Sequence, residues 1–161
     1  MKVRDVMNQP ALCCTADINV GAAVEFLWVR NFGMLPVVGN DRKLLGVVTD
    51  RDICIAMGTR NRLARELTVG EIATQKVFTC KPDDEIHEAL QTMAEKQVRR
   101  LPVVSREGVP QGVLSMGDII THGDPNKWER CCELSSEEII RSLKKIYSQK
   151  LSTIHTKTAT A

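Results

Sequence analysis

Aromatic residues and long apolar runs are both scarce in this sequence. Phe, Trp and Tyr make up only 4% of the 161 residues, so a core has to be built mainly from Val, Leu, Ile, Ala and Met. No run approaches the about 18 consecutive apolar residues of a transmembrane helix. No apolar stretch follows the charged residues 1–5 to form a signal peptide. We therefore expect a cytoplasmic globular protein without membrane contact.

The sequence also has no large excess of charge of either sign. Its 22 basic and 20 acidic residues leave a net charge of +2. Non-specific binding to nucleic acid depends on a positive excess, because each neutralised phosphate releases a counterion. Nucleic acid is therefore an unexpected partner, and any basic site has to be local.

The signatures of common enzymes and nucleotide-binding loops are absent. There is no G-x-x-x-x-G-K-[ST], G-x-G-x-x-G, H-E-x-x-H or G-x-S-x-G motif. His87, His122 and His155 fall on a helix face, a helix end and the C-terminal tail, and none has a Cys or Ser partner in the pattern. We therefore expect no enzymatic activity and no metal site.

Cysteine occurs six times, but not in a metal-binding pattern. No C-x-x-C is present, and four of the six form the vicinal pairs Cys13-Cys14 and Cys131-Cys132, which could bridge only with strain. We expect the cysteines to be reduced, mostly packed thiols. A thiol-sensing role is the alternative.

An internal repeat organises residues 1–122. Three motifs occur twice, always 66 positions apart and with no gap between the copies. They are LPVV at 35–38 and 101–104, GVVT at 46–49 with GVLS at 112–115, and DI at 52–53 and 118–119. The same offset pairs Val3 with Val69, Asp17 with Asp83 and Ala23 with Ala89. One constant offset through separate motifs indicates a duplicated unit.

Each copy has the pattern of a β-α-β-β-α unit. In the first copy, Asp17 is a candidate N-cap for a helix with an apolar stripe over residues 20–28. Two short apolar runs joined by a Gly-Asn-Asp turn then predict a hairpin, and a second helix follows over about residues 49–57. Short strands are also predicted at 11–13 and 77–79.

The two units are expected to form one pseudo-symmetric α+β body. A single unit of about 60 residues buries too little surface to be more than marginally stable. Two units packed sheet against sheet would share one core. We place the repeats at 1–66 and 67–123, with residues 58–67 as a polar bridge, and a C-terminal helix with a flexible tail at 124–161.

The C-terminal helix is predicted from a hydroxyl cap and early acids. Ser135 precedes Glu137 and Glu138, which complement the positive end of a helix dipole. An apolar face follows, formed by Ile139, Ile140, Leu143, Ile146 and Tyr147. Such a face usually docks on its own domain or on a second subunit, and contact with a separate protein is the alternative. Trp128, just upstream, could anchor either contact.

A hydroxyl and a carboxylate three residues apart begin the second helix of each copy. Thr49 and Asp52 occupy these positions in the first copy, and Ser115 and Asp118 in the second. One interpretation is a capping box. The other is a binding device, in which the carboxylate holds ribose hydroxyls while the hydroxyl and the helix N-terminus face phosphate. Recurrence in identical registers favours the binding device.

The arrangement of Pro-Val-Val followed by Gly-Val-Val-Thr-x-x-Asp resembles the CBS (cystathionine-beta-synthase) domain, and the tandem copies resemble a Bateman module. This resemblance covers residues 1–122. It implies two clefts between the repeats, a homodimer, and an adenosine-containing ligand: AMP, ADP or ATP, with S-adenosylmethionine or NAD as further candidates. It assigns ribose to Asp52 and Asp118, and phosphate to Thr49 and Ser115.

The resemblance also nominates apolar residues around each adenine. For the cleft of Ser115 and Asp118 these are Val77, Phe78, Val98 and Val113. For the cleft of Thr49 and Asp52 they are Ala11, Leu12, Phe32 and Val47. Ordinary core packing is the alternative for all eight.

The copies differ in charge just before the second LPVV. Arg99 and Arg100 stand there, whereas the first copy has Gly33 and Met34. Two guanidiniums would give permanently charged, bidentate donors to phosphate. We therefore expect the cleft of Ser115 and Asp118 to bind more strongly, with Arg51 as the candidate cation of the other cleft.

The sequence thus predicts an energy- or metabolite-sensing regulatory module that binds an adenine nucleotide. Binding would change its conformation or its association, and a separate effector protein could read that change. The alternative is a ligand-independent dimerisation scaffold, in which both Ser/Thr-x-x-Asp turns are only helix caps.

Overall fold

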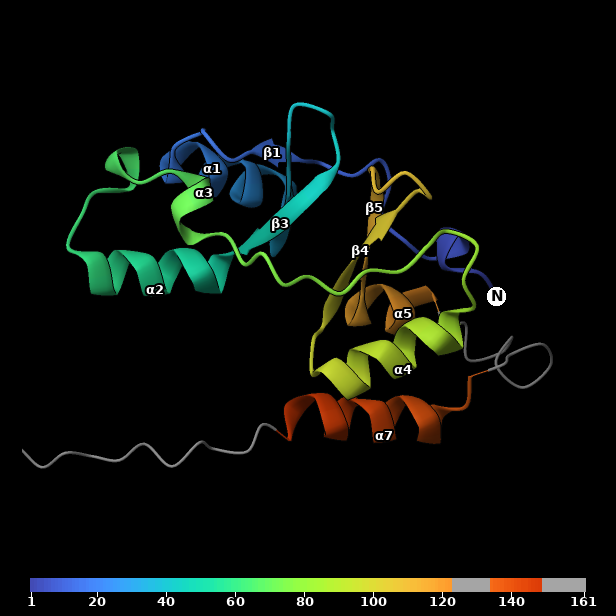
Figure 1. Cartoon of the computed structure of the whole chain (residues 1–161). Coiled ribbons are helices and arrows are strands. Elements are labelled where there is room, and N and C mark those ends of the chain that lie inside the picture. The colour runs from blue at the N-terminus through green and yellow to red at the C-terminus, as the bar shows by residue number, and fades with distance from the viewer. Residues whose placement is uncertain (123–133, 149–161) are drawn as a thin grey trace, which may run out of the picture.

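The computed structural model describes residues 1–122 and 134–148, and it confirms the predicted architecture of two repeats and a C-terminal helix (Figure 1). The predicted anchor Trp128, Cys131, Cys132, His155 and the tail lie outside the described residues. The first repeat contains η1 (Val3–Asp5), β1 (Cys14–Thr15), α1 (Val20–Arg30), β2 (Met34–Val38), β3 (Leu44–Thr49), α2 (Asp50–Arg60) and η2 (Ala64–Glu66). The second contains α3 (Val69–Ile72), α4 (Ile86–Lys96), β4 (Arg100–Val104), β5 (Pro110–Ser115) and α5 (Met116–His122), and α7 (Ser136–Tyr147) follows.

Each repeat is built on an antiparallel hairpin, β2–β3 or β4–β5, with equivalent registers. β1 adds a parallel strand to the first hairpin through Cys14 beside Val37. Cys80 makes the equivalent parallel bridge to Val103, 66 positions later. The predicted strands at 11–13 and 77–79 are therefore wrong by one to three residues, because those segments cross between the repeats before the pairing begins.

The first helix of each repeat begins slightly later than predicted. Asn19, not Asp17, caps α1, and its side-chain oxygen accepts a hydrogen bond from the Ala22 backbone N–H at 2.9 Å. α2 begins where predicted but continues to Arg60, so the expected polar bridge includes the last three residues of this helix. That bridge ends on the fully buried Leu67, which belongs to a core.

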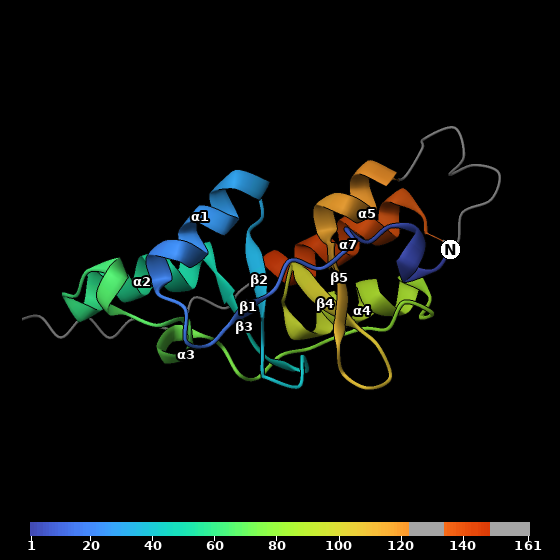
Figure 2. The same cartoon turned by 90° about the horizontal axis from the view of Figure 1, so that it is seen from above.

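The opening segments of the two repeats are exchanged. Val3 lies fully buried among the side chains of the second repeat, and Val69 lies fully buried in the first. Their backbones are anchored equivalently: the N–H of Val3 donates to the Asp84 carbonyl, and that of Val69 donates to the Ile18 carbonyl. Figure 2 accordingly shows the N-terminus on the side of α4 and α5, and α3 on the side of α2.

The exchange replaces the single shared core that we predicted with two cores. One cluster of buried apolar side chains lies in each repeat, and each cluster includes residues from the other repeat's opening segment. The single-core prediction is wrong because the buried apolar side chains form a separate cluster in each repeat. The exchanged opening segments join the repeats.

After the opening turn, each chain segment crosses the neighbouring hairpin before it reaches its own. Asn8 pairs with Val113 on β5, and Thr74 pairs with Val47 on β3, again 66 positions apart. The crossing is close because Gly112 and Gly46 face the incoming backbone. A Cβ at Gly112 would lie 2.6 Å from the Asn8 carbonyl oxygen, which is closer than real Cβ contacts.

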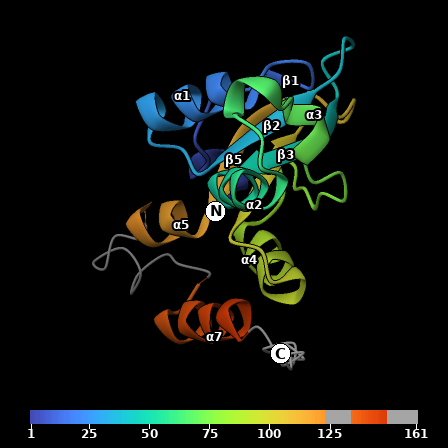
Figure 3. The ribbon, with the colours of Figure 1, turned by 90° about the vertical axis from the view of Figure 1, so that its left-hand side faces the viewer.

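The C-terminal helix α7 docks on α4, with Ile139 and Ile146 buried in the core of the second repeat. Figure 3 shows α7 beneath α4 and α5. Ser135 caps the helix as predicted, its hydroxyl accepting a hydrogen bond from the Glu138 N–H. Ile140 and Tyr147, which were predicted on the same apolar face, are instead largely exposed.

The glycine at the crossing gives a first prediction. Gly112→Ala should lower the free energy of unfolding by about 1–3 kcal/mol, because the added methyl must push the crossing backbone away. Gly58→Ala is the matched control: Gly58 lies in α2 with nothing within 4 Å of an added Cβ, and the change should stabilise the fold by about 0.5–1 kcal/mol. Urea denaturation measures both. A Gly112→Ala protein as stable as the wild type would contradict the close crossing.

Candidate functional site

Two cavities lie where the crossing segments pass between the repeats. The larger, which we call the Thr49 cavity, has a volume of about 470 Å³. It is lined by Met34, Val47, Thr49, Asp50, Arg51, Asp52, Thr74, Lys76, Val77, Phe78, Gln97, Val98, Arg99, Arg100, Pro102, Ile146 and Tyr147. Its size falls in the range of about 300–1,000 Å³ that is usual for small-molecule sites.

The second, which we call the Ser115 cavity, has a volume of about 290 Å³. It is lined by Asn8, Pro10, Ala11, Leu12, Arg30, Asn31, Phe32, Gly33, Met34, Arg100, Val113, Ser115 and Asp118. All fourteen residues predicted from the sequence line one of the two cavities.

The predicted grouping of these residues is wrong, because each cavity combines a Ser/Thr-x-x-Asp turn from one repeat with walls from the other. Val77, Phe78 and Val98 line the Thr49 cavity rather than the Ser115 cavity. Ala11, Leu12 and Phe32, which we predict for the Thr49 cavity, line the Ser115 cavity. Only Val47 and Val113 remain with the turn at the end of their own strand. The exchanged crossing segments account for this pairing.

Both Ser/Thr-x-x-Asp turns form a capping box. The Thr49 hydroxyl donates to Asp52 Oδ2 at 2.6 Å and accepts a bond from the Asp52 N–H at 3.2 Å. The backbone N–H of Thr49 donates to the same carboxylate oxygen at 2.9 Å. Ser115 and Asp118 repeat all three bonds at 2.6, 3.1 and 2.8 Å. The capping interpretation therefore holds at both turns, and it leaves Oδ1 of each aspartate for other partners.

That second oxygen differs between the cavities. Oδ1 of Asp118 accepts a hydrogen bond from the Asn8 side-chain amide at 2.7 Å. The residue equivalent to Asn8 is Thr74, and Oδ1 of Asp52 has no hydrogen-bond partner in residues 1–122 or 134–148. The Thr49 cavity thus offers an open carboxylate oxygen, whereas a ligand in the Ser115 cavity would share Oδ1 of Asp118 with Asn8.

The charge distribution also contradicts the predicted asymmetry. Four cationic side chains line the Thr49 cavity, namely Arg51, Lys76, Arg99 and Arg100, against the two acids Asp50 and Asp52. The Ser115 cavity has Arg30 and Arg100 against Asp118. Arg99 lies on the Thr49 side, and Arg100 borders both cavities. The cleft that we expected to be poor in cations is the richer one, because Arg99 and Arg100, at the start of β4, line the cavity that contains the Thr49 turn of the first repeat.

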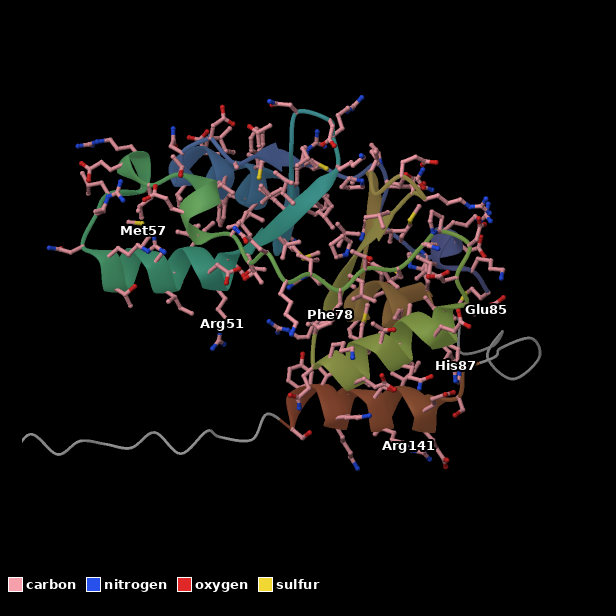
Figure 4. All side chains as sticks on the ribbon, viewed as in Figure 1. Arg51, Met57, Phe78, Glu85, His87 and Arg141 are labelled. Carbon is pink, nitrogen blue, oxygen red and sulfur yellow. The ribbon has the colours of Figure 1, made fainter. Side chains whose placement is uncertain are left out.

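Figure 4 shows two labelled lining residues of the Thr49 cavity in relation to the elements. Arg51 extends from the first turn of α2 toward the side of the molecule that carries α4 and α7, and Phe78 lies between α2 and α4 in this view. This position agrees with the prediction that Arg51 is a cation of the cleft of Thr49 and Asp52.

Sequence reasoning missed several lining residues. Asn8 and Thr74 could have been found from their shared offset, since each occupies the same position in its crossing segment. Lys76 could have been found as the only charge on a crossing segment. Ile146 and Tyr147 carry no sequence signal for the cavity, because their place depends on how α7 docks.

The thiols and imidazoles of the described residues form no metal site. Burial raises the pKa of Cys14 to about 11, with a smaller contribution from Cys13, and burial raises that of Cys80 to about 12, with a smaller contribution from Asp84. Within residues 1–122 and 134–148, no group of three or more His, Cys, Asp or Glu side chains could hold a metal ion. His87 instead contacts Glu138 at 3.1 Å, joining α4 to α7.

The family model of the CBS domain matches this chain twice, at residues 3–58 and 69–123. The chain belongs to the CBS-domain family. Its two repeats form a CBS pair, and the resemblance expected from the sequence is confirmed. α7 lies beyond the second match.

Curated and solved relatives agree with this assignment. Hypoxic response protein 1 of Mycobacterium tuberculosis is 34% identical over 119 residues, which cover 74% of this chain and 82% of the relative. Its crystal structure, with two coordinated zinc ions, covers 77% of this chain and 100% of the relative with a TM-score of 0.69 and 32% identity.

Two further CBS-pair structures contain adenosine derivatives. The CBS domain pair of protein MJ0100, in complex with 5′-methylthioadenosine and S-adenosyl-L-methionine, has a TM-score of 0.69 at 26% identity over 75% of this chain and 94% of that one. CBSX2 in complex with AMP has a TM-score of 0.64 at 25% identity over 74% of this chain and 93% of that one. CBS pairs similar to this chain therefore bind adenosine-containing ligands.

None of the helices described here has the length and apolar character needed to cross a bilayer.

Thiol reactivity gives a second prediction. At pH 8 a thiol with a pKa of about 11 is ionised in roughly one molecule in a thousand, and the thiolate is the form that alkylates. In native protein treated with iodoacetamide, Cys14 and Cys80 should react at least about tenfold more slowly than the exposed Cys54. Peptide mass spectrometry measures the rates, with urea-unfolded protein as the control. Equal rates in the native protein would support the thiol-sensing alternative.

Proposed function

We propose that this chain is a non-catalytic regulatory module that binds an adenine nucleotide in the Thr49 cavity. The observation that carries the proposal is the composition of this cavity, in which apolar walls, an open carboxylate oxygen and an excess of cations meet. These are the three kinds of group that a base, a ribose and a phosphate require.

The apolar walls suit the base. Val47, Val77, Phe78 and Val98 come from both repeats, and all are half-buried or buried. An adenine ring between such side chains gains from apolar contact on both faces. Oδ1 of Asp52 is then available to accept a hydrogen bond from a ribose hydroxyl, which is a charge-assisted bond of the stronger kind.

The charges favour a phosphorylated ligand. The four cations of the Thr49 cavity exceed its two acids, so an anion gains from the net positive field. S-adenosylmethionine carries a positive sulfonium and gains less. We therefore favour AMP, ADP or ATP over S-adenosylmethionine. We expect the Ser115 cavity to bind more weakly, because Oδ1 of Asp118 already accepts a hydrogen bond from Asn8.

Ligand in the Thr49 cavity would touch both repeats and α7. The affinity of the ligand then depends on how the repeats and α7 are arranged. Bound ligand therefore shifts the protein toward the arrangement that binds it more tightly, by the ratio of its affinities for the two arrangements. This is the physical basis of the proposed regulatory role. The alternative, a ligand-independent scaffold, would use the same turns only as caps.

A third prediction separates the two. With protein freed of bound ligand, titration calorimetry should show AMP binding, and Asp52→Asn should weaken it by roughly tenfold to a hundredfold, the effect of losing a charged hydrogen bond of about 1.5–3 kcal/mol. Asp118→Asn is the matched control, since it alters the same capping box in the other cavity, and it should change this affinity by less than about threefold.

The scaffold alternative would be supported by an absence of heat with AMP, ATP, NAD and S-adenosylmethionine alike. A larger loss in Asp118→Asn than in Asp52→Asn would return the site to the Ser115 cavity.

We further propose that the protein forms a homodimer through α1. Val24 and Trp28 on α1 are 41% and 83% exposed, whereas their equivalents on α4, Leu90 and Ala94, are 1% and 6% exposed under α7. The first repeat has no helix of its own in that place within the described residues. A second copy of α1 related by a two-fold axis would cover the face with the same residues.

The fourth prediction tests this interface. Trp28→Glu should raise the dimer dissociation constant at least about thirtyfold, because an exposed aromatic anchor at a helix interface contributes about 2 kcal/mol or more. Leu45→Glu is the control: Leu45 is also exposed but lies on the β2–β3 hairpin, and its change should leave the dimer intact. Analytical ultracentrifugation measures both. Wild-type protein that sediments as a monomer would contradict the proposal.

A further inference from the structure

The last turn of α7 forms part of the wall of the Thr49 cavity, although α7 lies outside the two matched CBS repeats. Ile146 is 3% exposed and belongs both to the core of the second repeat and to the cavity wall. Next to it, the Gln97 side-chain amide donates to the Lys145 carbonyl at 3.4 Å. The docking of α7 therefore determines the shape of one side of the cavity.

Tyr147, the last residue of α7, lies beside Arg99, an arginine of the proposed phosphate site. The guanidinium carbon of Arg99 lies 5.9 Å from the centre of the Tyr147 ring, within the distance of a cation–π contact. Arg99 is exposed, and none of the described carboxylates is within 4.0 Å of its guanidinium. Its backbone is fixed separately, since the Arg99 carbonyl accepts the Met116 N–H at 3.0 Å.

We propose that Tyr147 is a positioning residue for Arg99, so that recognition of the ligand's phosphate depends on docked α7. This rests on the proposed function, because it concerns the phosphate of the nucleotide in the Thr49 cavity. The ring restrains the direction of the guanidinium without neutralising its charge. Arg99 is therefore oriented in advance and still able to donate two hydrogen bonds to a phosphate.

The coupling is reciprocal. If docked α7 strengthens phosphate binding, bound phosphate strengthens the docking of α7 by the same factor. A ligand without phosphate has no phosphate contact with Arg99 and therefore strengthens the docking of α7 less. The docking of α7 therefore responds to the phosphate of the ligand. The CBS pair itself supplies the contacts to the base and the ribose.

Titration calorimetry with AMP and adenosine tests the positioning role. Tyr147→Ala should weaken AMP binding about two- to fivefold, the range of an exposed cation–π contact, and leave adenosine binding unchanged. Tyr147→Phe keeps the ring and should retain wild-type affinity for AMP. Ile140→Ala is the control on the same helix, since Ile140 is exposed and does not line the cavity.

A double-mutant cycle isolates the pair. In an Arg99→Ala background, Tyr147→Ala should cause no further loss of AMP affinity, because the side chain that it positions is gone. Additive losses, or equal losses for AMP and adenosine, would overturn the positioning role. Failure of the wild-type protein to bind AMP would instead overturn the proposed function, so the two failures are distinguishable.

Hydrogen exchange tests the reciprocal effect on the same proteins. Saturating AMP should slow exchange of the α7 backbone amides about two- to fivefold in the wild-type protein, and adenosine should slow it less. In Tyr147→Ala the difference between the two ligands should disappear. Equal protection of α7 by AMP and adenosine in the wild-type protein would contradict the coupling.

Discussion

The exchange of the two opening segments is the constraint on which the rest of this structure depends. Val3 and Val69 are each buried in the core of the opposite repeat, and the segments that follow them cross at Gly112 and Gly46. Neither core is complete without the other repeat. The repeats are consequently joined by shared hydrophobic burial and by backbone hydrogen bonds, and neither is expected to fold separately.

The cavities follow directly from that exchange. A crossing segment leaves the neighbouring hairpin and returns to its own, and the space beside it is closed by the turn at the start of the neighbouring α2 or α5. Equivalent strand registers and crossings thus produce two related cavities. Side chains then make them unequal, because Asn8 bonds to Asp118 while Asp52 stays open, and because Arg99 faces only the Thr49 side.

Sequence reasoning reached the repeat, the longer helices, the hairpins and all fourteen proposed lining residues, because a constant offset and apolar periodicity can be read directly from the sequence. The short helix α3 was not predicted. It failed where partners come from elsewhere in the chain. It assigned Val77 and Phe78 to the turn of their own repeat. The sequence of one repeat does not indicate that its opening segment packs against the other repeat. It placed Trp28 in a buried apolar stripe, but Trp28 is exposed. The equivalent position in the second repeat, Ala94, is buried, and α7 docks on the helix α4 that carries it. It also chose Asp17 over Asn19, two residues apart, because both side chains can cap a helix.

The account therefore predicts a specific arrangement of ligand in one cavity that two repeats and α7 build together. Its most direct test is a crystal structure of protein that has been freed of bound ligand and then crystallised with AMP. The account predicts density in the Thr49 cavity, with the ribose on Asp52 Oδ1, the base between walls of both repeats, and the phosphate against Arg99. Density confined to the Ser115 cavity, or phosphate turned away from Arg99, would contradict it.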